Sequence, residues 1–532
     1  MTSLGTLASR VLGMVRDMAT APLFGLSGGG VMDAFVIAYR IPNLFRRLFG
    51  EGALTASYLP VVAGQLETDP QRAWQLASVM FTWLVVLLGG LVVLAEGLFA
   101  LIWLIWGDVP GVGLLMGLSA VMLPYLLLIC LAAQVTATLH ALTHFTVPAL
   151  TPAVLNVTWL AAVWLVAPMF APNQHAQAYA LAVAVVVAGV LQVGVQLPTL
   201  RRFGFRFDYN LAASRDALKR IGRTLTPMLF GLAVTQINTL IDSLIAWGLA
   251  QPPGRPEQIA WLGGAVRYPM EQGAAAAIYY GERMYEFPLG LIGLAVATAI
   301  FPLLSRHAAR GDRRQLGSDM TLGLRLVICL GVPAGMGLII LAEPVSRLLF
   351  ERGHFTAHDT ARAARMIACY ASGVWAYCAS HVVVRGFYAL GDPGTPVRIA
   401  ACVVGLNLTL NLLLVWPLAE AGLAVATSIS AAVQVAVLVA IFSRRKAPLD
   451  WPALAAMAAR TVAATLVMAA VGYVSLKLTT PADGLLAKLV RVAVPLGLSG
   501  AAYASGYWLL GGRELGMFLT GRTPVADEFA AD

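Results

Sequence analysis

Residues 109–200 contain no Asp, Glu, Lys or Arg, which makes a stretch of 92 residues without any of the four charged types. A helix that crosses a bilayer needs only about 20 apolar residues, so this stretch has room for three spans. Soluble domains carry about 25% charged residues, whereas this chain carries 12%, with 59% hydrophobic residues. A soluble enzyme, a disordered chain and a disulfide scaffold are therefore excluded. The sequence predicts an all-α polytopic membrane protein.

Further segments of low charge continue this pattern along the chain. They lie between Arg72 and Asp108 and at 224–250, 284–305, 326–346, 366–384, 399–416, 421–443, 461–476 and 492–512. Two charged but helical segments in the first 60 residues complete the set. Together they predict about fourteen transmembrane helices.

Basic loops predict the orientation, because short loops rich in Lys and Arg stay in the cytoplasm. Three such clusters lie between predicted spans, at 201–223, 306–314 and 444–446. Counting spans places all three on one side, which we predict to be cytoplasmic, together with both termini. Contact with anionic lipid headgroups is a second interpretation of these clusters. The formal net charge of +9 is attributed to topology, and no nucleic-acid partner is expected.

Short sequence matches recur at a nearly constant offset. Leu94-Ala95-Glu96 returns 247 residues later as Leu341-Ala342-Glu343, and Ala141-Leu142 returns 248 residues later as Ala389-Leu390. Two weaker matches follow the same order. Each match alone is weak, but their common order indicates duplication of a unit of about 245 residues.

The repeat predicts the domain organisation. Each copy contains six spans, and an even number gives both copies one orientation, as in parallel repeats. The predicted domains are an N-terminal six-helix lobe at 1–205, a C-terminal six-helix lobe at 206–446, a two-helix hairpin at 447–512 and a cytoplasmic tail at 513–532. Two such lobes around a central cavity are typical of transporters that work by alternating access.

Ionisable residues inside predicted spans are the candidate functional groups, because each costs about 2.5–3.5 kcal/mol on insertion scales. The densest set lies near the N-terminus and comprises Arg10, Arg16, Asp17, Asp33, Arg40, Arg46, Arg47 and Glu51. Arginines outnumber acids in this set, and guanidinium groups bind phosphate through paired hydrogen bonds. The set therefore predicts binding of an anion such as phosphate or pyrophosphate. Internal salt bridges, with side chains that reach toward the membrane surface, are the alternative interpretation.

The second copy has its own ionisable residues within predicted spans. Arg283 and Glu286 lie in the region that matches the charged start of the first copy. Asp242 is alone in one apolar segment, and His381 and Arg385 lie four residues apart in another. Asp242 is expected either to pair with Arg385 or to couple transport to Na⁺ or H⁺. Both interpretations stay open at this point.

One pattern typical of catalysis occurs, since Gly25-Leu26-Ser27-Gly28-Gly29 matches G-x-S-x-G. It lies in a short turn between two predicted helical spans without a strand before it, so we interpret it as a flexible glycine-rich turn. The sequence has no Walker phosphate loop, no HExxH and no CxxC. Its five cysteines are scattered through apolar stretches, which fits neither a disulfide framework nor a zinc site. We therefore expect no enzymatic activity, no cofactor and no metal.

Several stretches resemble one family of membrane transporters. Ser9-Arg10-Val11-Leu12-Gly13-Met14-Val15-Arg16-Asp17 is similar to the opening helix of the MurJ (MviN) lipid II flippases, and Asp33-Ala34-Phe35 follows at the expected place. Ile41-Pro42-Asn43-Leu44-Phe45-Arg46-Arg47-Leu48-Phe49-Gly50-Glu51-Gly52-Ala53 resembles the most recognisable stretch of that family. Residues 282–288 and 386–397 resemble its eighth helix and the entry to its eleventh.

This resemblance implies fourteen helices in two six-helix lobes, with the last two helices lining a groove for a lipid tail. It implies transfer of lipid II, the undecaprenyl-pyrophosphate-linked precursor of peptidoglycan, from the cytoplasmic to the periplasmic leaflet of the bacterial inner membrane. Membrane lipids and enzymes of peptidoglycan synthesis are the implied neighbours. The implied substrate-binding residues are Arg10, Arg16, Asp33, Arg46, Glu51 and Arg283.

Gating or ion coupling is the expected role of a second set, Asp17, Asp242, His381 and Arg385. Some relatives carry acidic or amide residues for a cation where this chain has His381 and Arg385, so a Na⁺ site like theirs is not expected. The alternative function is a cation-coupled exporter or polysaccharide-lipid flippase of the wider MOP superfamily, which includes the multidrug (MATE) exporters. An exporter of organic cations should carry acidic and aromatic cavity residues rather than surplus arginine. A membrane enzyme acting on lipid-linked sugars would need an acid/base or metal cluster.

Overall fold

The computed structural model describes residues 2–26, 28–252, 254, 257–259, 266–479 and 484–516. The chain divides into two compact units, which are described separately. Unit 1 comprises Met1–Ala276 with Arg352–Phe355, and unit 2 comprises Ala277–Glu351 with Thr356–Asp532. Helices build both units, and the described residues contain no β-strand beyond two isolated bridges.

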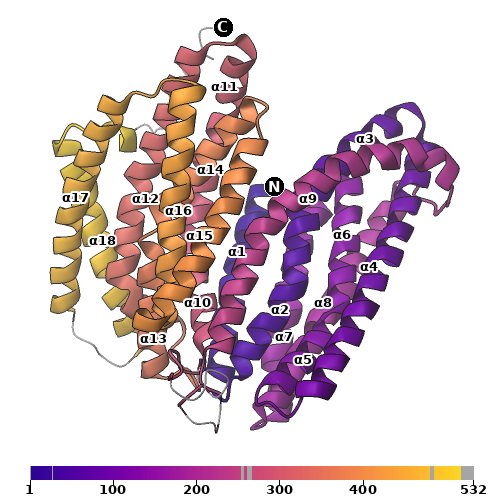
Figure 1. Cartoon of the computed structure of the whole chain (residues 1–532), viewed down its shortest axis with the longest axis horizontal. Coiled ribbons are helices and arrows are strands. Elements are labelled where there is room, and N and C mark those ends of the chain that lie inside the picture. The colour runs from indigo at the N-terminus through magenta and orange to yellow at the C-terminus, as the bar shows by residue number, and fades with distance from the viewer. Residues whose placement is uncertain are drawn as a thin grey trace. The chain divides into compact units, whose positions relative to one another are not determined.

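Unit 1 contains the helices of the first half of the chain (Figure 1). In order they are α1 (Thr2–Phe24), α2 (Val31–Phe45), the π-helix η1 (Arg46–Ala53), α3 (Leu54–Thr68), α4 (Pro70–Trp106), α5 (Val112–Met122), α6 (Pro124–Ala141), α7 (Thr146–Ala161), the short η2 (Ala162–Val166) and η3 (Ala167–Phe170), α8 (Gln174–Arg202) and α9 (Leu211–Gly248).

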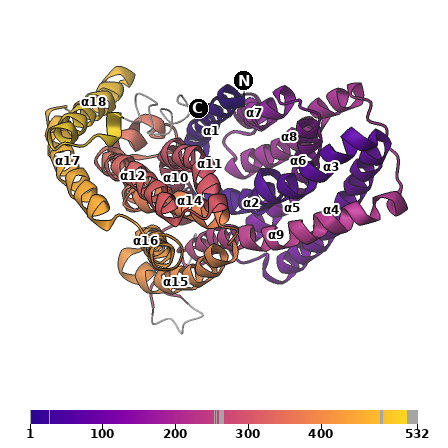
Figure 2. The same cartoon turned by 90° about the horizontal axis from the view of Figure 1, so that it is seen from above.

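Unit 2 contains the remaining helices, with the first turn of α10 assigned to unit 1 (Figure 2). They are α10 (Ala274–Pro288), the π-helix η5 (Leu289–Gly293), α11 (Leu294–Arg310), α12 (Arg313–Leu349), α13 (Ala357–Ala371), α14 (Val374–Ala389), α15 (Gly394–Leu418), α16 (Glu420–Arg445), α17 (Trp451–Leu478) and α18 (Leu485–Leu509).

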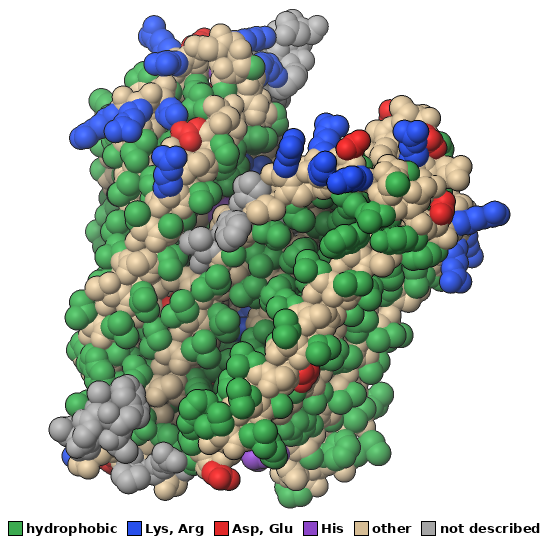
Figure 3. Space-filling view, turned by 45° about the vertical axis from the view of Figure 1, so that its right-hand side comes forward, with side chains coloured by type: hydrophobic (Ala, Val, Ile, Leu, Met, Phe, Trp, Pro, Cys, Tyr) green, Lys and Arg blue, Asp and Glu red, His purple; other side chains and the backbone are tan. Residues whose placement is uncertain are grey.

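Within the described residues, ten helical stretches are long and apolar enough to cross a membrane, and the bent pair α13–α14 makes eleven. Hydrophobic side chains cover the faces of these helices, while Lys and Arg gather mainly near one end of each unit (Figure 3). Leu94 on α4 is 74% exposed and Leu478 on α17 is 78% exposed, as side chains that face lipid should be. The prediction of an all-α polytopic membrane protein is thus confirmed. The count of fourteen helices stays a prediction, since α1, α2–α3 and α9 fall outside this criterion.

The same interruption occurs in a long helix of each unit. In unit 1, Pro42 lies near the end of α2, and the π-helix η1 follows before α3. In unit 2, Pro288 ends α10, and the π-helix η5 follows before α11. Proline removes a backbone donor from the ladder, and a π-turn absorbs the resulting change of register. Asp33 and Arg40 are seven residues apart on α2, but Arg47, seven residues further on, lies in η1, so the α-helical face does not continue to it.

Matching contacts also recur at the offset of the sequence repeat. Asp69 caps the start of α4, and Asp312, 243 residues later, caps the start of α12. In unit 1 the Ser78 hydroxyl accepts the backbone N–H of Asp208 at 3.0 Å. In unit 2 the Thr321 hydroxyl accepts the backbone N–H of Asp450 at 3.2 Å. Thr321 lies 243 residues after Ser78 in the sequence, and Asp450 lies 242 residues after Asp208, as a duplicated unit would produce.

A third matching contact closes the loop that follows the fourth predicted span of each copy. In unit 1 the His144 ring lies 5.6 Å from the Phe203 ring. In unit 2 the equivalent positions form an ion pair, with Lys446 Nζ 2.8 Å from Asp392 Oδ2. Because Lys446 donates this hydrogen bond, it lowers the pKa of the Asp392 carboxyl. These contacts support the repeat. However, α9 lies in compact unit 1, although the sequence repeat assigns it to the second lobe. The boundaries 1–205, 206–446 and 447–512 therefore stay predictions.

Neutral polar side chains join the helices of the charge-free stretch. The Gln134 amide donates to the Ala77 carbonyl at 2.8 Å, and Gln196 accepts from the Thr136 hydroxyl at 2.8 Å. Gln192 donates to the Thr151 carbonyl at 3.1 Å. Each of these bonds satisfies a buried polar group between helices without placing a charge in the membrane. They explain how residues 109–200 pack without a single ion pair.

Glu514 anchors the C-terminal hairpin, α17 and α18, which packs on α12. Its carboxylate is 1% exposed, forms an ion pair with Arg325 of α12 and accepts a hydrogen bond from Tyr507 at 2.6 Å. Burial alone would raise the pKa of Glu514, but the bonds from Tyr507 and Arg325 lower it overall. The second residue of the predicted tail at 513–532 is thus buried, and the tail from 517 lies outside the described residues.

A second long-range ion pair holds unit 2 together. Arg362 of α13 and Glu420 at the start of α16 lie 2.8 Å apart, with side chains only 6% and 7% exposed. A buried pair of this kind is costly to break, because removing one partner leaves the other charge in an apolar surrounding. The sequence analysis did not select either residue, since both lie just outside the predicted spans.

The Arg362–Glu420 pair gives a test of this packing. Glu420→Ala removes the carboxylate beside the buried guanidinium, so we expect a loss of about 3–5 kcal/mol of stability, measured as a lower unfolding temperature in detergent. Arg362→Met combined with Glu420→Leu should restore most of it. The control is Arg72→Ala, which breaks an exposed pair with Asp69 and should cost less than about 1 kcal/mol. Equal effects of Glu420→Ala and the control would contradict this assignment.

Candidate functional site

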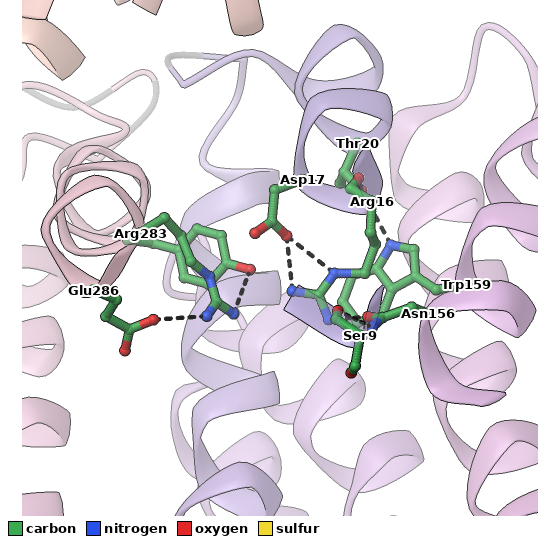
Figure 4. Close-up of polar contacts among 9 residues, drawn as sticks. Ser9, Arg16, Asp17, Thr20, Asn156, Trp159, Arg283 and Glu286 are labelled. Atoms are coloured by element: carbon green, nitrogen blue, oxygen red, sulfur yellow. Dashed lines mark hydrogen bonds and ion pairs between the residues drawn. The ribbon is translucent and has the colours of Figure 1, made fainter. Parts of the chain in front are cut away.

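Arg16 of α1 is the most enclosed of the predicted substrate-binding arginines. It is 4% exposed, and its Nε and Nη2 both donate to Asp17 Oδ1, at 3.0 and 2.8 Å (Figure 4). Neighbouring residues on a helix do not usually face each other, so this pair depends on the length of the arginine side chain. The pair neutralises the guanidinium inside the helix bundle of unit 1.

Aromatic and amide groups complete the surroundings of Arg16. Its guanidinium lies 4.5 Å from the Trp159 ring centre and 5.9 Å from that of Tyr39. Its Nη1 donates to Asn156 Oδ1 at 3.4 Å, while Trp159 donates to the Thr20 hydroxyl at 3.0 Å. Rings stabilise a desolvated cation through their electron-rich faces. The sequence analysis missed these surroundings, although the amide of Asn156 in a largely apolar stretch was a usable signal.

Asp33 of α2 has a structural role within unit 1. Its two carboxylate oxygens accept the backbone N–H groups of Gly273 at 2.7 Å and Ala276 at 2.8 Å. These donors belong to the start of α10, where N–H groups lack helical partners. A carboxylate there also interacts favourably with the helix dipole. Gly273 has φ +87°, and an added Cβ would meet the Leu26 carbonyl at 2.4 Å, so this turn requires glycine.

The remaining residues of the N-terminal set differ in their surroundings. Arg40 is buried and donates to the Thr239 carbonyl of α9 at 3.3 Å. Arg46 donates to Asn43 Oδ1 at 2.8 Å, one turn earlier on the same helix. Arg10 is exposed on α1. The side chain of Glu51 lies outside the described residues.

Arg283 is the predicted substrate-binding residue of unit 2. Its Nη1 lies 3.0 Å from Glu286 Oε2, and its Nη2 donates to the Tyr279 hydroxyl at 3.2 Å (Figure 4). The guanidinium lies 4.9 Å from the centre of the Tyr279 ring. Arg283 thus repeats the arrangement of Arg16, with one carboxylate from its own helix and an aromatic face. Its side chain is 25% exposed, so it remains more accessible than Arg16.

The predicted ion-coupling residues fall into different units. Asp242 of α9, in unit 1, is 3% exposed and accepts a hydrogen bond from Asn238 at 3.4 Å. In unit 2 the Arg385 guanidinium lies 5.2 Å from the Phe301 ring centre, and His381 is exposed one turn earlier on α14. Pairing of Asp242 with Arg385 stays a prediction. Among the described residues, no group of three His, Cys, Asp or Glu side chains could hold a metal ion.

Comparison with known proteins identifies the family. The sequence matches the family described as "Lipid II flippase MurJ" over residues 21–492. The chain belongs to the MurJ family. The resemblance found in the sequence is thereby confirmed.

Relatives in the MurJ family cover most of the chain. A protein of Vibrio cholerae named "Probable lipid II flippase MurJ" is 35% identical over 81% of this chain and 80% of its own length. A relative from Rhizobium tropici with the same name is 29% identical over 96% of this chain and 93% of its own length.

Solved structures show the same fold at lower identity. A structure titled "Lipid II flippase MurJ, inward closed conformation" matches with a TM-score of 0.74 and 22% identity, covering 96% of this chain and 99% of that one. An inward-facing multidrug resistance MATE transporter of the MOP superfamily matches with a TM-score of 0.64 and 12% identity, covering 82% of this chain and 96% of that one. The MurJ fold of this chain is therefore the MOP transporter fold.

The capping role of Asp33 can be tested directly. Asp33→Ala removes the acceptors of two buried N–H groups, and each unsatisfied group costs about 1–3 kcal/mol. We expect lower thermal stability and faster hydrogen exchange of the amides at residues 273–276. Asp33→Asn keeps one acceptor and should give an intermediate result. Unchanged exchange in Asp33→Ala would contradict the capping role.

Proposed function

We propose that this protein transfers lipid II from the cytoplasmic to the periplasmic leaflet of the bacterial inner membrane by alternating access. The membership of the chain in the MurJ family over residues 21–492 carries this proposal. Both termini are proposed to be cytoplasmic, because the basic clusters at 201–223, 306–314 and 444–446 then lie inside. The protein is proposed to act without covalent chemistry.

Arg16 of unit 1 and Arg283 of unit 2 are each proposed to be a binding group for phosphate of the substrate. Each guanidinium already holds one carboxylate, Asp17 or Glu286, from its own helix. A pyrophosphate offers more acceptor oxygens and more negative charge than one carboxylate, so it can replace that partner through paired hydrogen bonds. The internal carboxylate then keeps the arginine neutralised whenever no substrate is bound. Arg10, Arg46 and Glu51 are proposed to line the path of the substrate.

Charge movement favours the proposed direction. Moving one charge through 100 mV is worth about 2.3 kcal/mol, and an anion that leaves a negative interior moves downhill. Asp242, His381 and Arg385 are proposed to influence closure rather than to bind Na⁺, since two of these three side chains are basic. The groove along α17 and α18 is proposed to hold the lipid tail.

The proposal is tested by depleting the protein in its host and measuring lipid II at the outer leaflet. Wild type should restore export, whereas Arg16→Ala and Arg283→Ala should reduce it at least about tenfold, because each removes a charge-assisted contact. Arg72→Ala, an exposed arginine of α4, is the matched control and should restore export. Export that continues without the protein would overturn the function.

A double variant separates binding from structure. Arg16→Gln with Asp17→Asn replaces the buried ion pair by neutral groups of similar size, so stability should be close to that of wild type. Export should still fail, since the Arg16 guanidinium is no longer available to the pyrophosphate. A stable double variant that exports normally would show that Arg16 and Asp17 form only a structural pair, while the function itself would stand.

A further inference from the structure

Glu96 of α4 is an acid in the middle of an apolar helix. It is the only charged residue between Arg72 and Asp108, and α4 runs along the outer edge of unit 1 (Figure 1). Trp106, which is 53% exposed, follows ten residues later, about 15 Å along the helix. Tryptophan favours the membrane surface, and the hydrocarbon core of a bilayer is about 30 Å thick. Glu96 therefore lies deep inside the apolar layer.

The carboxylate of Glu96 has no hydrogen-bond or ion-pair partner in the part of the chain that the structure describes. An ionisable side chain inside a membrane ordinarily faces the interior of its own helix bundle and pairs there. Around Glu96 the helix instead faces outward, since Val93, one turn earlier, is 71% exposed. The other residues one turn away, Val92, Phe99 and Ala100, are apolar as well. Glu96 thus needs a donor that the described residues do not supply.

The second copy of the repeat shows what Glu96 lacks. Glu343 of α12, 247 residues after Glu96, is its counterpart in the matching sequence Leu-Ala-Glu. One carboxylate oxygen of Glu343 lies 3.5 Å from Nη2 of Arg347, four residues later on the same helix. The residue four positions after Glu96 is Ala100. The first copy therefore has the acid without its cation, and charge complementarity favours a cationic partner from outside this chain.

Three glycines open the same side of α4. Gly89 and Glu96 are seven residues apart, so they share one face of the helix. Gly90 and Gly97 have the same spacing on the adjoining face. A Cβ added at any of the three glycines would meet no atom within 4 Å, so no other described helix fills this space. Glycine weakens a helix interior, but within a membrane it lets a second helix approach closely.

We propose that this side of α4 docks a transmembrane helix of another membrane protein, and that this helix carries a Lys or Arg side chain near its middle. The cation pairs with Glu96 away from water, and the backbone of the partner helix packs over Gly90 and Gly97. A second copy of this chain does not fit as the partner, because symmetrical contact through α4 would bring two Glu96 carboxylates together.

This docking surface is separate from the proposed phosphate-binding groups Arg16 and Arg283, which lie on α1 and α10. It does not depend on the proposed transport function. Failure of one proposal leaves the other intact, because helix docking is measured as binding at α4, whereas transport is measured as export of lipid II.

Designed transmembrane peptides test the surface on the purified full-length protein in phosphatidylcholine vesicles. One peptide is a leucine-alanine helix of about 21 residues with a single Arg at its centre, and the second has Leu there. Energy transfer between labelled protein and labelled peptide measures the affinity. We expect wild type to bind the Arg peptide about tenfold more tightly than the Leu peptide, and Glu96→Gln to remove this difference. Equal affinities of wild type for the two peptides would overturn the proposal.

Two further variants separate the surface from general effects. Glu343→Gln is the matched control, because Glu343 already has Arg347 as its partner. It should leave binding of the Arg peptide unchanged, and a loss equal to that of Glu96→Gln would refute the assignment to α4. Gly97→Ile fills the open space and keeps the acid, so it should weaken binding of the Arg peptide. Unchanged binding in Gly97→Ile would contradict the proposed close packing.

A photo-reactive amino acid at position 93 identifies the occupant in the host membrane. We expect a crosslink to a membrane protein whose transmembrane helix contains Lys or Arg, and Glu96→Gln should abolish this crosslink. Crosslinks only between two copies of this chain, or only to lipid, would overturn the proposal.

Discussion

The cost of a charge inside the membrane is the constraint on which the rest of this structure depends. Arg16, Arg283 and Arg362 each lie within 3.0 Å of a carboxylate oxygen. Desolvation of an unpaired ion at these positions would exceed the stability of an ordinary helix contact. Where no charge is needed, as in residues 109–200, glutamine and threonine side chains satisfy the polar groups between helices instead.

These ion pairs fall into two classes with different consequences. Arg16–Asp17 and Arg283–Glu286 join residues of one helix, so exchanging the carboxylate for another anion separates no helices. Arg362–Glu420 and Arg325–Glu514 join residues far apart in sequence, and breaking them would detach α13 from α16 or the C-terminus from α12. The arginines proposed to bind substrate belong to the first class. A site that must open and close repeatedly can use local pairs, whereas long-range pairs suit a fixed scaffold.

Sequence alone predicted the helical membrane class because a bilayer demands long apolar segments, a local property of the chain. It also selected Arg16 and Asp17, since charges in apolar segments stand out. It could not assign the role of Asp33, because the N–H groups that Asp33 caps lie 240 residues away. The sequence analysis did not select Arg362 or Glu514, because they lie at the ends of predicted spans, where charged residues are common. Only the packing of the helices shows that both are buried.

The two copies share their scaffold but not their charges. Aspartates cap α4 and α12 alike, and hydroxyls of Ser78 and Thr321 hold equivalent backbone groups. The loop that His144 and Phe203 close in unit 1 is closed by Asp392 and Lys446 in unit 2. These contacts only hold the backbone of the loop in place, so a ring contact in one copy and an ion pair in the other can have the same structural role. The charges of the two copies differ instead in segments that do not hold this scaffold, such as residues 10–51, where five arginines stand against three acids.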